Sequence, residues 1–407
     1  MNNEMPLEKI SVLELRSEGP VQFCGMILAD MGANVVSIGR ILKEKDALSA
    51  GKSSYGWDFN ELAKNLGDAL SRNKRSILLN LKSEDGRKIF YRMTESADVV
   101  IEGFRPGVVE SLELSYEKIA EINPKIIYCS ISGYGQNGPY RTMPGHDPNY
   151  VGMGGAFSVI GIKDGPPVIP MNLVADWPAG SLNGVIGILA ALVAREQTGR
   201  GQFVDIAITD GVVANMNLAV YDYFNSNRDW KRGATPLNGG FPCVALFRAG
   251  DCEYISIGCI EPWFWERLCR ELGVEEFIPH QWAEGKKRDE IFKRFSEIFL
   301  TKSRDEWFNI LINKNICVGK VYNIGELAND PQVKHREMLV EIEHPIKGKV
   351  TQAGQPIKLS DSPTNLNRYP IALPGQHTEE ILQENGFTEE DLKIFYASGA
   401  ISKYTGV

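Results

Sequence analysis

The chain has 407 residues, 43% of them hydrophobic, and a formal net charge of −8. This length exceeds what one hydrophobic core usually supports, so we expect two domains. The 44 lysines and arginines are scattered along the sequence, which argues against a nucleic-acid-binding protein.

The cysteines and the apolar runs indicate a cytoplasmic protein. The seven cysteines follow no metal-binding spacing, and several lie inside apolar runs, so we expect buried free thiols and no metal. The N-terminus lacks the pattern of a signal peptide, and no apolar run approaches the length that crosses a bilayer. The longest run, residues 185–194, predicts a buried core helix, so no membrane partner is expected.

The first two hundred residues alternate strand and helix patterns. The strands are expected at 10–15, 35–38, 76–81, 97–102, 125–132 and 203–208, and the helices at 22–31, 84–95, 116–121 and 211–224. This order predicts a parallel sheet covered by helices on both faces. We therefore expect a large, doubly wound, Rossmann-like α/β domain over residues 1–225.

The rest of the chain follows a different pattern. A strand at 254–258 and helices at 263–272, 289–300 and 304–313 predict a small α+β domain over residues 226–335. Residues 336–407 form a third segment, rich in proline and glycine from 345 to 374 and helical after Thr378.

A GxGxxG pattern follows the expected strand at 125–132. It is formed by Gly133, Gly135 and Gly138, but Pro139 comes next and no helix opens there. No acidic residue ends a strand at the distance that a dinucleotide site requires. We interpret this segment as a loop.

A histidine and two carboxylates, His146, Asp147 and Asp176, lie in one short region of the sequence. Imidazole and carboxylate groups exchange protons near neutral pH, so such groups can remove a proton from one face of a carbon and return one to the other. Asp176 comes before Pro178 and a run of helix formers, which predicts a helix N-cap, and the helix dipole there favours the ionised form. Asp147 could cap a helix, bind a backbone N–H group, or pair with Asp176 and share a proton with it.

Glu261 adds a third carboxylate, on a turn between an apolar strand and the expected helix at 263–272. Acidic residues commonly precede helices, so Glu261 could be an ordinary loop residue. Alternatively it pairs with His146, which would fix the imidazole tautomer and raise its basicity.

Together these residues resemble the alpha-methylacyl-CoA racemases, a branch of the family III CoA-transferase fold. The likeness runs nearly end to end. It is carried by the segments 27–33, 101–107, 133–139, 145–150, 172–177, 260–263 and 374–378. The Gly145-His146-Asp147 and Ile260-Glu261-Pro262 segments are the ones that resemble racemases rather than transferases.

The resemblance implies racemisation of 2-methylacyl-CoA thioesters by proton transfer through an enolate. His146, with Glu261, would act on one face of the α-carbon, and Asp176, with Asp147, on the other. Backbone N–H groups near residues 145–147 would stabilise the enolate, and no metal, flavin or nicotinamide is needed. The resemblance also implies an interlocked homodimer and a C-terminal segment that returns to the first, CoA-binding domain.

Phosphate groups on CoA call for basic residues. The candidates that match family positions are Arg40, Arg72, Lys74, Arg75 and Arg105. Ligand contact and ordinary surface charge remain equal alternatives for residues 72–75. Ligand contact is favoured for Arg105, because Pro106 and Gly107 fix a loop after a strand, where α/β sheets bind ligands.

Two other functions remain open. A CoA-transferase would form an aspartyl-CoA thioester on Asp176, and departures from the racemase pattern at residues 18–22, at Asn238 and at 244–247 leave room for it. A non-catalytic subunit of a heteromeric transferase is the other alternative, but it would not need both His146 and Asp176. An insertion-like segment at 43–70 has no assigned role.

Overall fold

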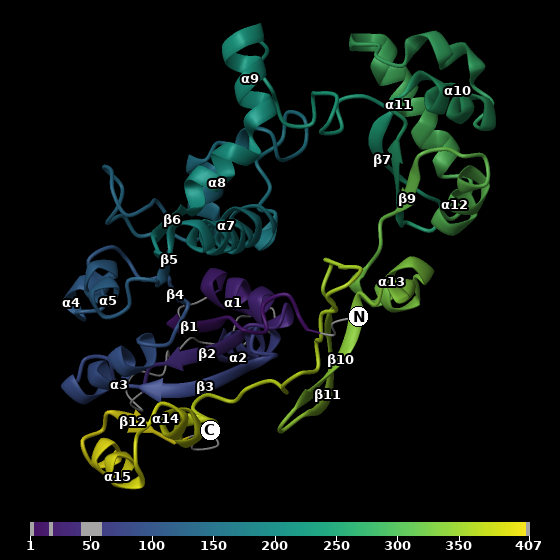
Figure 1. The fold of residues 1–407 in the computed structure, drawn as a ribbon. Helices are drawn as coiled ribbons and strands as arrows, with labels where there is room; N and C mark the ends of the chain where they lie inside the picture. Colours follow the sequence, from purple (N-terminus) through teal and green to yellow (C-terminus); the bar gives the residue numbers. More distant parts are fainter. Residues whose placement is uncertain (1–3, 16–18, 42–58, 404–407) are drawn as a thin grey trace. The chain divides into compact units, whose positions relative to one another are not determined.

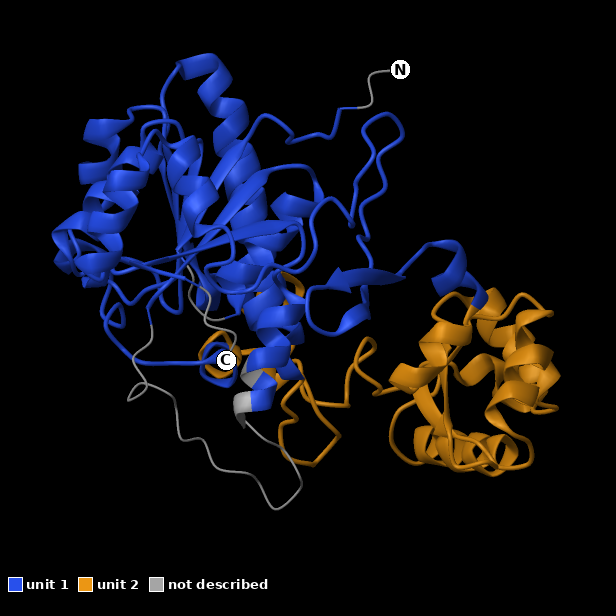
Figure 2. Ribbon diagram, turned by 90° about the horizontal axis from the view of Figure 1, so that it is seen from below, with its two compact units in different colours: residues 1–150, 171–215, 331–407 blue, residues 151–170, 216–330 orange. Residues whose placement is uncertain are grey.

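The structure is a computed structural model that describes residues 4–15, 19–41 and 59–403. Its contacts divide the chain into two compact units (Figure 2). Unit 1 comprises residues 1–150, 171–215 and 331–407, and unit 2 comprises residues 151–170 and 216–330. Glu18 and most of the insertion-like segment, residues 43–58, lie outside the described residues.

The main sheet of unit 1 has seven strands in the order β12-β3-β2-β1-β4-β5-β6 (Figure 1). The strands are β1 (Ser11–Leu15), β2 (Asn34–Gly39), β3 (Lys74–Leu79), β4 (Val99–Glu102), β5 (Ile127–Ser132), β6 (Phe203–Ala207) and β12 (Ile401–Ser402). The short β12 pairs antiparallel with β3, and the other described pairings in this sheet are parallel. This confirms the predicted α/β fold. The strand order reverses between β1 and β4, and open α/β sheets bind ligands beyond the carboxyl ends of the strands at such a point.

Helices cover both faces of this sheet. One face packs against α1 (Pro20–Asp30) and α7 (Asn183–Thr198). The other face shares a core with α3 (Glu84–Thr94), α5 (Tyr116–Ile122), α14 (Thr378–Glu384) and α15 (Glu389–Ala397). Alternation along the strands explains this arrangement: Leu13 and Leu15 join the second core, whereas Glu14 faces Gly25 of α1.

Smaller elements complete unit 1. They are α2 (Phe59–Ala69), α4 (Val108–Ser111), α6 (Asp147–Met153, which continues into unit 2), α8 (Ile208–Asn215), α13 (Pro331–His335) and the hairpin of β10 (Leu339–His344) and β11 (Gly348–Ala353). The C-terminal segment thus belongs to unit 1, since β12 completes the main sheet beside β3.

One helical segment is longer than expected. The π-helix η4 (Ala175–Leu182) runs directly into α7, and together they span 24 residues. By length and composition alone this segment could cross a membrane, so the expectation that no apolar run approaches that length is wrong. Pro178 does not interrupt the helix, and the apolar stretch is therefore extended at its N-terminal end. The segment packs against α1, β5 and β6, as a core helix does.

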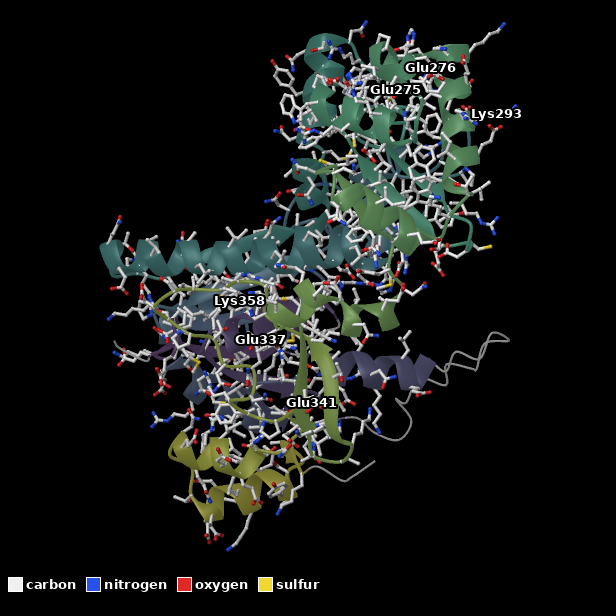
Figure 3. All side chains as sticks on the ribbon, turned by 90° about the vertical axis from the view of Figure 1, so that its right-hand side faces the viewer. Glu275, Glu276, Lys293, Glu337, Glu341 and Lys358 are labelled. Carbon is white, nitrogen blue, oxygen red and sulfur yellow. The ribbon has the colours of Figure 1, made fainter. Side chains whose placement is uncertain are left out.

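Unit 2 is a three-stranded antiparallel sheet with helices. The strands are β7 (Val244–Arg248), β8 (Tyr254–Gly258) and β9 (Val318–Lys320), and the helices are α9 (Asn217–Ser226), α10 (Pro262–Glu271), α11 (Gly285–Phe299) and α12 (Arg304–Ile312). Phe247, Trp265 and Phe295 are among the aromatic residues of its core. Exposed charged side chains such as Glu275 and Lys293 lie outside that core (Figure 3).

The division between the units differs in detail from the predicted domains. The helix expected at 211–224 breaks at Met216 into α8 and α9. The chain passes from unit 1 to unit 2 after Asn215 rather than after residue 225. Residues 151–170 belong to unit 2 because side chains from further along the chain bind their backbone. Arg232 donates to the carbonyl of Phe157 at 3.2 Å, and Asn238 donates to that of Val159 at 3.1 Å.

Candidate active site

Two of the site residues proposed from the sequence, Asp176 and Arg105, lie at the carboxyl edge of the main sheet. Gly19, which follows β1 in the chain, is the N-cap of α1 and has a φ of +62°. A Cβ atom added to Gly19 would lie 4.0 Å from Asp176 Oδ2. Arg105 follows β4 on the other side of the point where the strand order reverses. Asp176 and Arg105 therefore lie where this fold class binds ligands.

Asp176 lies within the first turn of η4, and Val174 is the N-cap. The prediction that Asp176 is itself the N-cap is therefore wrong. The side chain of Asp147 supplies the capping hydrogen bonds instead. The backbone N–H of Asp176 donates to Asp147 Oδ2 at 3.1 Å, and the N–H of Ala175 also bonds to this carboxylate. A side chain from another segment thus satisfies the first N–H groups of the helix. The carboxylate of Asp176 is left available for other contacts.

The environment of Asp176 makes it a stronger base than an ordinary aspartate. Burial raises its pKa to about 6, and the negative charge of Asp147 adds to this. Asn172 donates to Asp176 Oδ2 at 2.7 Å and, with the charge of His146, acts in the opposite direction. A carboxylate with this pKa is mostly ionised at pH 7 and can still take up a proton, which suits general acid–base chemistry.

Asn172 is a site residue that the sequence reasoning missed. An amide does not titrate, so the search for acids and bases passed over it. Its position four residues before Asp176 was the available signal, since a short loop can bring the two side chains together.

His146 precedes α6, and its imidazole is exposed. Its carbonyl accepts the N–H of Asn149 at 2.8 Å, and its own N–H donates to Asn149 Oδ1 at 3.0 Å. The turn before it is fixed by Tyr150, whose hydroxyl donates to the carbonyl of Gly145. A Cβ atom at Gly133 or Gly145 would come within 2.4 or 2.7 Å of the Tyr150 ring, so both positions require glycine.

Tyr150 also links the histidine turn to Asp176 and Arg105. Burial, together with the negative charge of Asp176, raises the pKa of Tyr150 to about 12, and the positive charge of Arg105 acts against this rise. The structure thus brings His146, Asp147, Asp176 and Arg105 into one region of unit 1.

Glu261 is the N-cap of α10 in unit 2 and is half-buried. Its side chain makes no capping hydrogen bond. It lies near Cys317, whose pKa is raised by burial and by the Glu261 charge. Because Glu261 and His146 belong to different units, their pairing stays a prediction.

The basic residues proposed for CoA binding fall into two groups. Arg40 and Arg105 are exposed and follow β2 and β4. Arg72, Lys74 and Arg75 are buried, so they are not ordinary surface charge. They pair with Asp30 at 2.8 Å, with Glu14 at 2.5 Å and with Glu384 at 2.7 Å, respectively. These pairs explain the three cations without a ligand, and their contact with CoA stays a prediction.

Residues 7–378 match the sequence profile described as CoA-transferase family III. The chain belongs to this family. It is 33% identical over 395 residues to the alpha-methylacyl-CoA racemase of Homo sapiens, with 95% of both chains covered. It is 31% identical over 422 residues to a formyl-CoA:oxalate CoA-transferase of Rhodopseudomonas palustris (strain BisA53), with 97% of both covered.

A solved structure supports the same assignment. The crystal structure of a CAIB/BAIF family protein from Brucella suis matches with a TM-score of 0.79 and 27% identity, covering 94% of this chain and all of that one. As a member of CoA-transferase family III, the chain is an enzyme of acyl-CoA metabolism.

Proposed function

We propose that this family III enzyme racemises 2-methylacyl-CoA thioesters by moving the α-proton from one face of the carbon to the other. One observation carries the proposal: Asp147, the residue next to His146, accepts the backbone N–H of Asp176 at 3.1 Å, so the histidine turn and the reactive carboxylate are joined. Two groups that both exchange protons near neutral pH thus lie in one region of unit 1. The racemases among the relatives that match over nearly the whole chain add support.

The proton transfer runs in two steps. His146 or Asp176, whichever is unprotonated, removes the α-proton, and the electron pair of the C–H bond moves onto the thioester oxygen to give an enolate. The other residue then donates its proton to the opposite face of the α-carbon, and the thioester carbonyl re-forms. Each residue ends in the protonation state in which the other began. By resemblance, His146 serves the S enantiomer and Asp176 the R enantiomer.

The enolate oxygen needs a hydrogen-bond donor. The backbone N–H of His146 is already bonded to Asn149. The N–H of Asp147, the first of α6, is not among those that find an acceptor within the described part of the chain. We assign the stabilisation of the enolate to this group.

Glu261 and Asp147 support the two proton carriers in this proposal. Asp147 holds the first turn of η4 in place through the N–H of Asp176. Glu261 would orient His146, and Arg40 and Arg105 would bind the CoA phosphates. The CoA part of the substrate is the only cofactor-like group required. Two chains would form the active homodimer, as the resemblance implies.

A CoA-transferase is the second candidate, favoured by the half-buried carboxylate of Asp176, which Asn172 orients. Relatives with transferase names also match over most of the chain. Asp176 would attack the thioester carbonyl, giving a mixed anhydride and releasing CoA thiolate. The thiolate would then attack the aspartyl carbonyl, which releases the donor acid and leaves CoA on the enzyme as an aspartyl thioester. An acceptor carboxylate would take the CoA by the reverse of these steps.

Isotope exchange separates the two reactions. The purified enzyme is incubated with (S)-2-methylacyl-CoA in heavy water without an acceptor acid, beside His146→Ala and Asp176→Asn. Deuterium at the α-carbon with loss of optical purity is the expected result for the parent enzyme. Both variants should keep optical purity, and His146→Ala should also lose exchange, whereas Asp176→Asn can still exchange the α-proton through His146 with retention of configuration. CoA transfer to an added carboxylate without exchange, dependent on Asp176 and indifferent to His146, would replace the proposal with the transferase.

A further inference from the structure

Three neighbouring strands carry a row of polar residues at the carboxyl edge of the main sheet. Glu102 on β4 is the register partner of Ser130 on β5, which is in turn the partner of Asp205 on β6. Partners in a parallel register point to the same face. Glu102 and Ser130 are buried at 1% and 0% exposure, whereas Asp205 on the edge strand is exposed.

This row connects the loops that follow β4 and β5. The backbone N–H of Phe104 donates to Glu102 Oε2 at 2.7 Å, and the hydroxyl of Ser130 also bonds to Glu102. From the second loop, Gln136 donates its side-chain amide to Ser130 Oγ at 2.6 Å and its backbone N–H to Asp205 Oδ2 at 3.1 Å. The loop at 133–139, set aside as a dinucleotide site, is therefore tied to the loop that carries Arg105.

We propose that Glu102 is a positioning residue that fixes the Arg105 loop for binding the CoA part of the substrate. The inference rests on the proposed role of Arg105. Glu102 anchors the residue immediately before Arg105, and Gly107, two residues after Arg105 and with a φ of +97°, turns the chain into α4. An arginine held at both sides loses less conformational freedom when it binds a phosphate.

The electrostatics of Glu102 are consistent with a role beyond packing. Burial raises the pKa of Glu102 to about 7, and the bonds from Ser130 and Phe104 offset only part of this, while Glu110 and Asp205 add negative charge. A buried acid without full compensation is more common at functional sites than in ordinary cores. The Arg105 charge also acts to lower the pKa of Tyr150, the residue that fixes the histidine turn.

The experiment compares Glu102→Ala with Glu102→Gln, which keeps an acceptor for the Phe104 N–H. CoA affinity is measured by isothermal titration calorimetry, and kcat and KM are measured with an acyl-CoA. We expect Glu102→Ala to weaken CoA binding and raise KM by about tenfold, the size of one lost charged contact, with kcat within about threefold. Glu102→Gln should bind within about threefold of the parent enzyme. Glu121→Ala, an exposed acid on α5, is the matched control and should leave CoA affinity and KM unchanged.

A second variant covers the case in which Glu102→Ala does not fold. Ser130→Ala removes the bridge to Gln136 and leaves the Glu102–Phe104 bond, so CoA binding should weaken by less, about threefold. Unchanged CoA affinity in Glu102→Ala would overturn the inference, as would a loss of kcat and stability that Glu102→Gln fails to rescue. If the parent enzyme itself bound no CoA, the proposed function would fall as well.

Discussion

Two regions of unit 1 hold buried charges in different ways. At the start of β3, Arg72, Lys74 and Arg75 each meet carboxylates at 2.5 to 3.0 Å. At the carboxyl edge of the sheet, Asp176 and Glu102 lie among neutral donors and other acids, and burial raises the pKa of both. In the first region each buried charge has a partner of opposite sign, although burial still raises the pKa of Asp30, so removing one partner is costly. In the second region the buried acids lack such a partner, so their charges cost stability and are available for chemistry. Removing a charge should therefore destabilise the protein in the first region and stabilise it in the second.

The largest effect is expected at Lys74, whose ammonium bonds to Glu14 at 2.5 Å and to the carbonyl of Gln22 at 2.7 Å. Lys74→Met leaves a buried carboxylate without its cation, which costs about 3–5 kcal/mol of folding free energy. Urea unfolding measures it, with exposed Lys82→Ala as the control. The double variant Glu14→Leu/Lys74→Met should recover most of the loss, since no charge is left buried. A single variant as stable as the parent would show that the pair is not structural.

The next effect concerns Arg105, an exposed arginine for which the structure gives no ion pair among the described residues. Arg105→Ala should weaken CoA binding by about 10- to 100-fold and leave the melting temperature unchanged. Arg200→Ala, an exposed arginine just before β6, tests whether any lost positive charge has this effect. Equal losses of CoA affinity in the two variants would mean that Arg105 acts only through its contribution to the overall electrostatic field of the protein.

The contrast between the two regions shows which features of the structure could be predicted from the sequence. The parallel sheet followed from the alternation of apolar strands and helices, and the cluster of His146, Asp147 and Asp176 followed from residue types that exchange protons. The roles of residues 72–75 could not follow, because their partners Asp30, Glu14 and Glu384 are distant in the chain. Sequence pattern shows a charge but not the group that it meets.

The prediction that Asp176 is a helix N-cap was wrong for the same reason, because the side chain that caps the helix comes from a distant part of the chain. Asp before a proline and helix formers favours an N-cap locally, but Asp147 reaches in from another segment and caps the first turn. Asn172 and Tyr150 were missed because one does not titrate and the other acts through the backbone of Gly145. Strands β7, β9, β10 and β11 were also not predicted, and the apolar pattern of the short β9 is too brief to detect.

A smaller effect should appear in the pH dependence of racemisation. The active pair carries one proton, on either His146 or Asp176, so kcat/KM should follow the same bell-shaped profile in both directions. The pKa of Asp176 is about 6, and its carboxylate is ionised above that pH and protonated below it. Activity should therefore fall about tenfold for each pH unit below 6. A profile that falls at low pH but stays flat at high pH would indicate the transferase, which needs only an ionised Asp176.

The smallest effect is a gain in stability on removing the reactive carboxylate. The folded-state pKa of Asp176, about 6, lies above its ordinary value of 3.8. This group therefore favours folding below pH 3.8, and the contribution is lost as pH rises through 6. Asp176→Asn cannot ionise and still offers an oxygen to Asn172, so at pH 7.5 it should be more stable than the parent by on the order of 1 kcal/mol, allowing for solvent screening. Thermal unfolding at pH 7.5 and 4.5 measures the gain, which should shrink at the lower pH. A less stable variant at pH 7.5 would mean that the Asp176 charge is compensated like those at β3, and the contrast between the two regions would disappear.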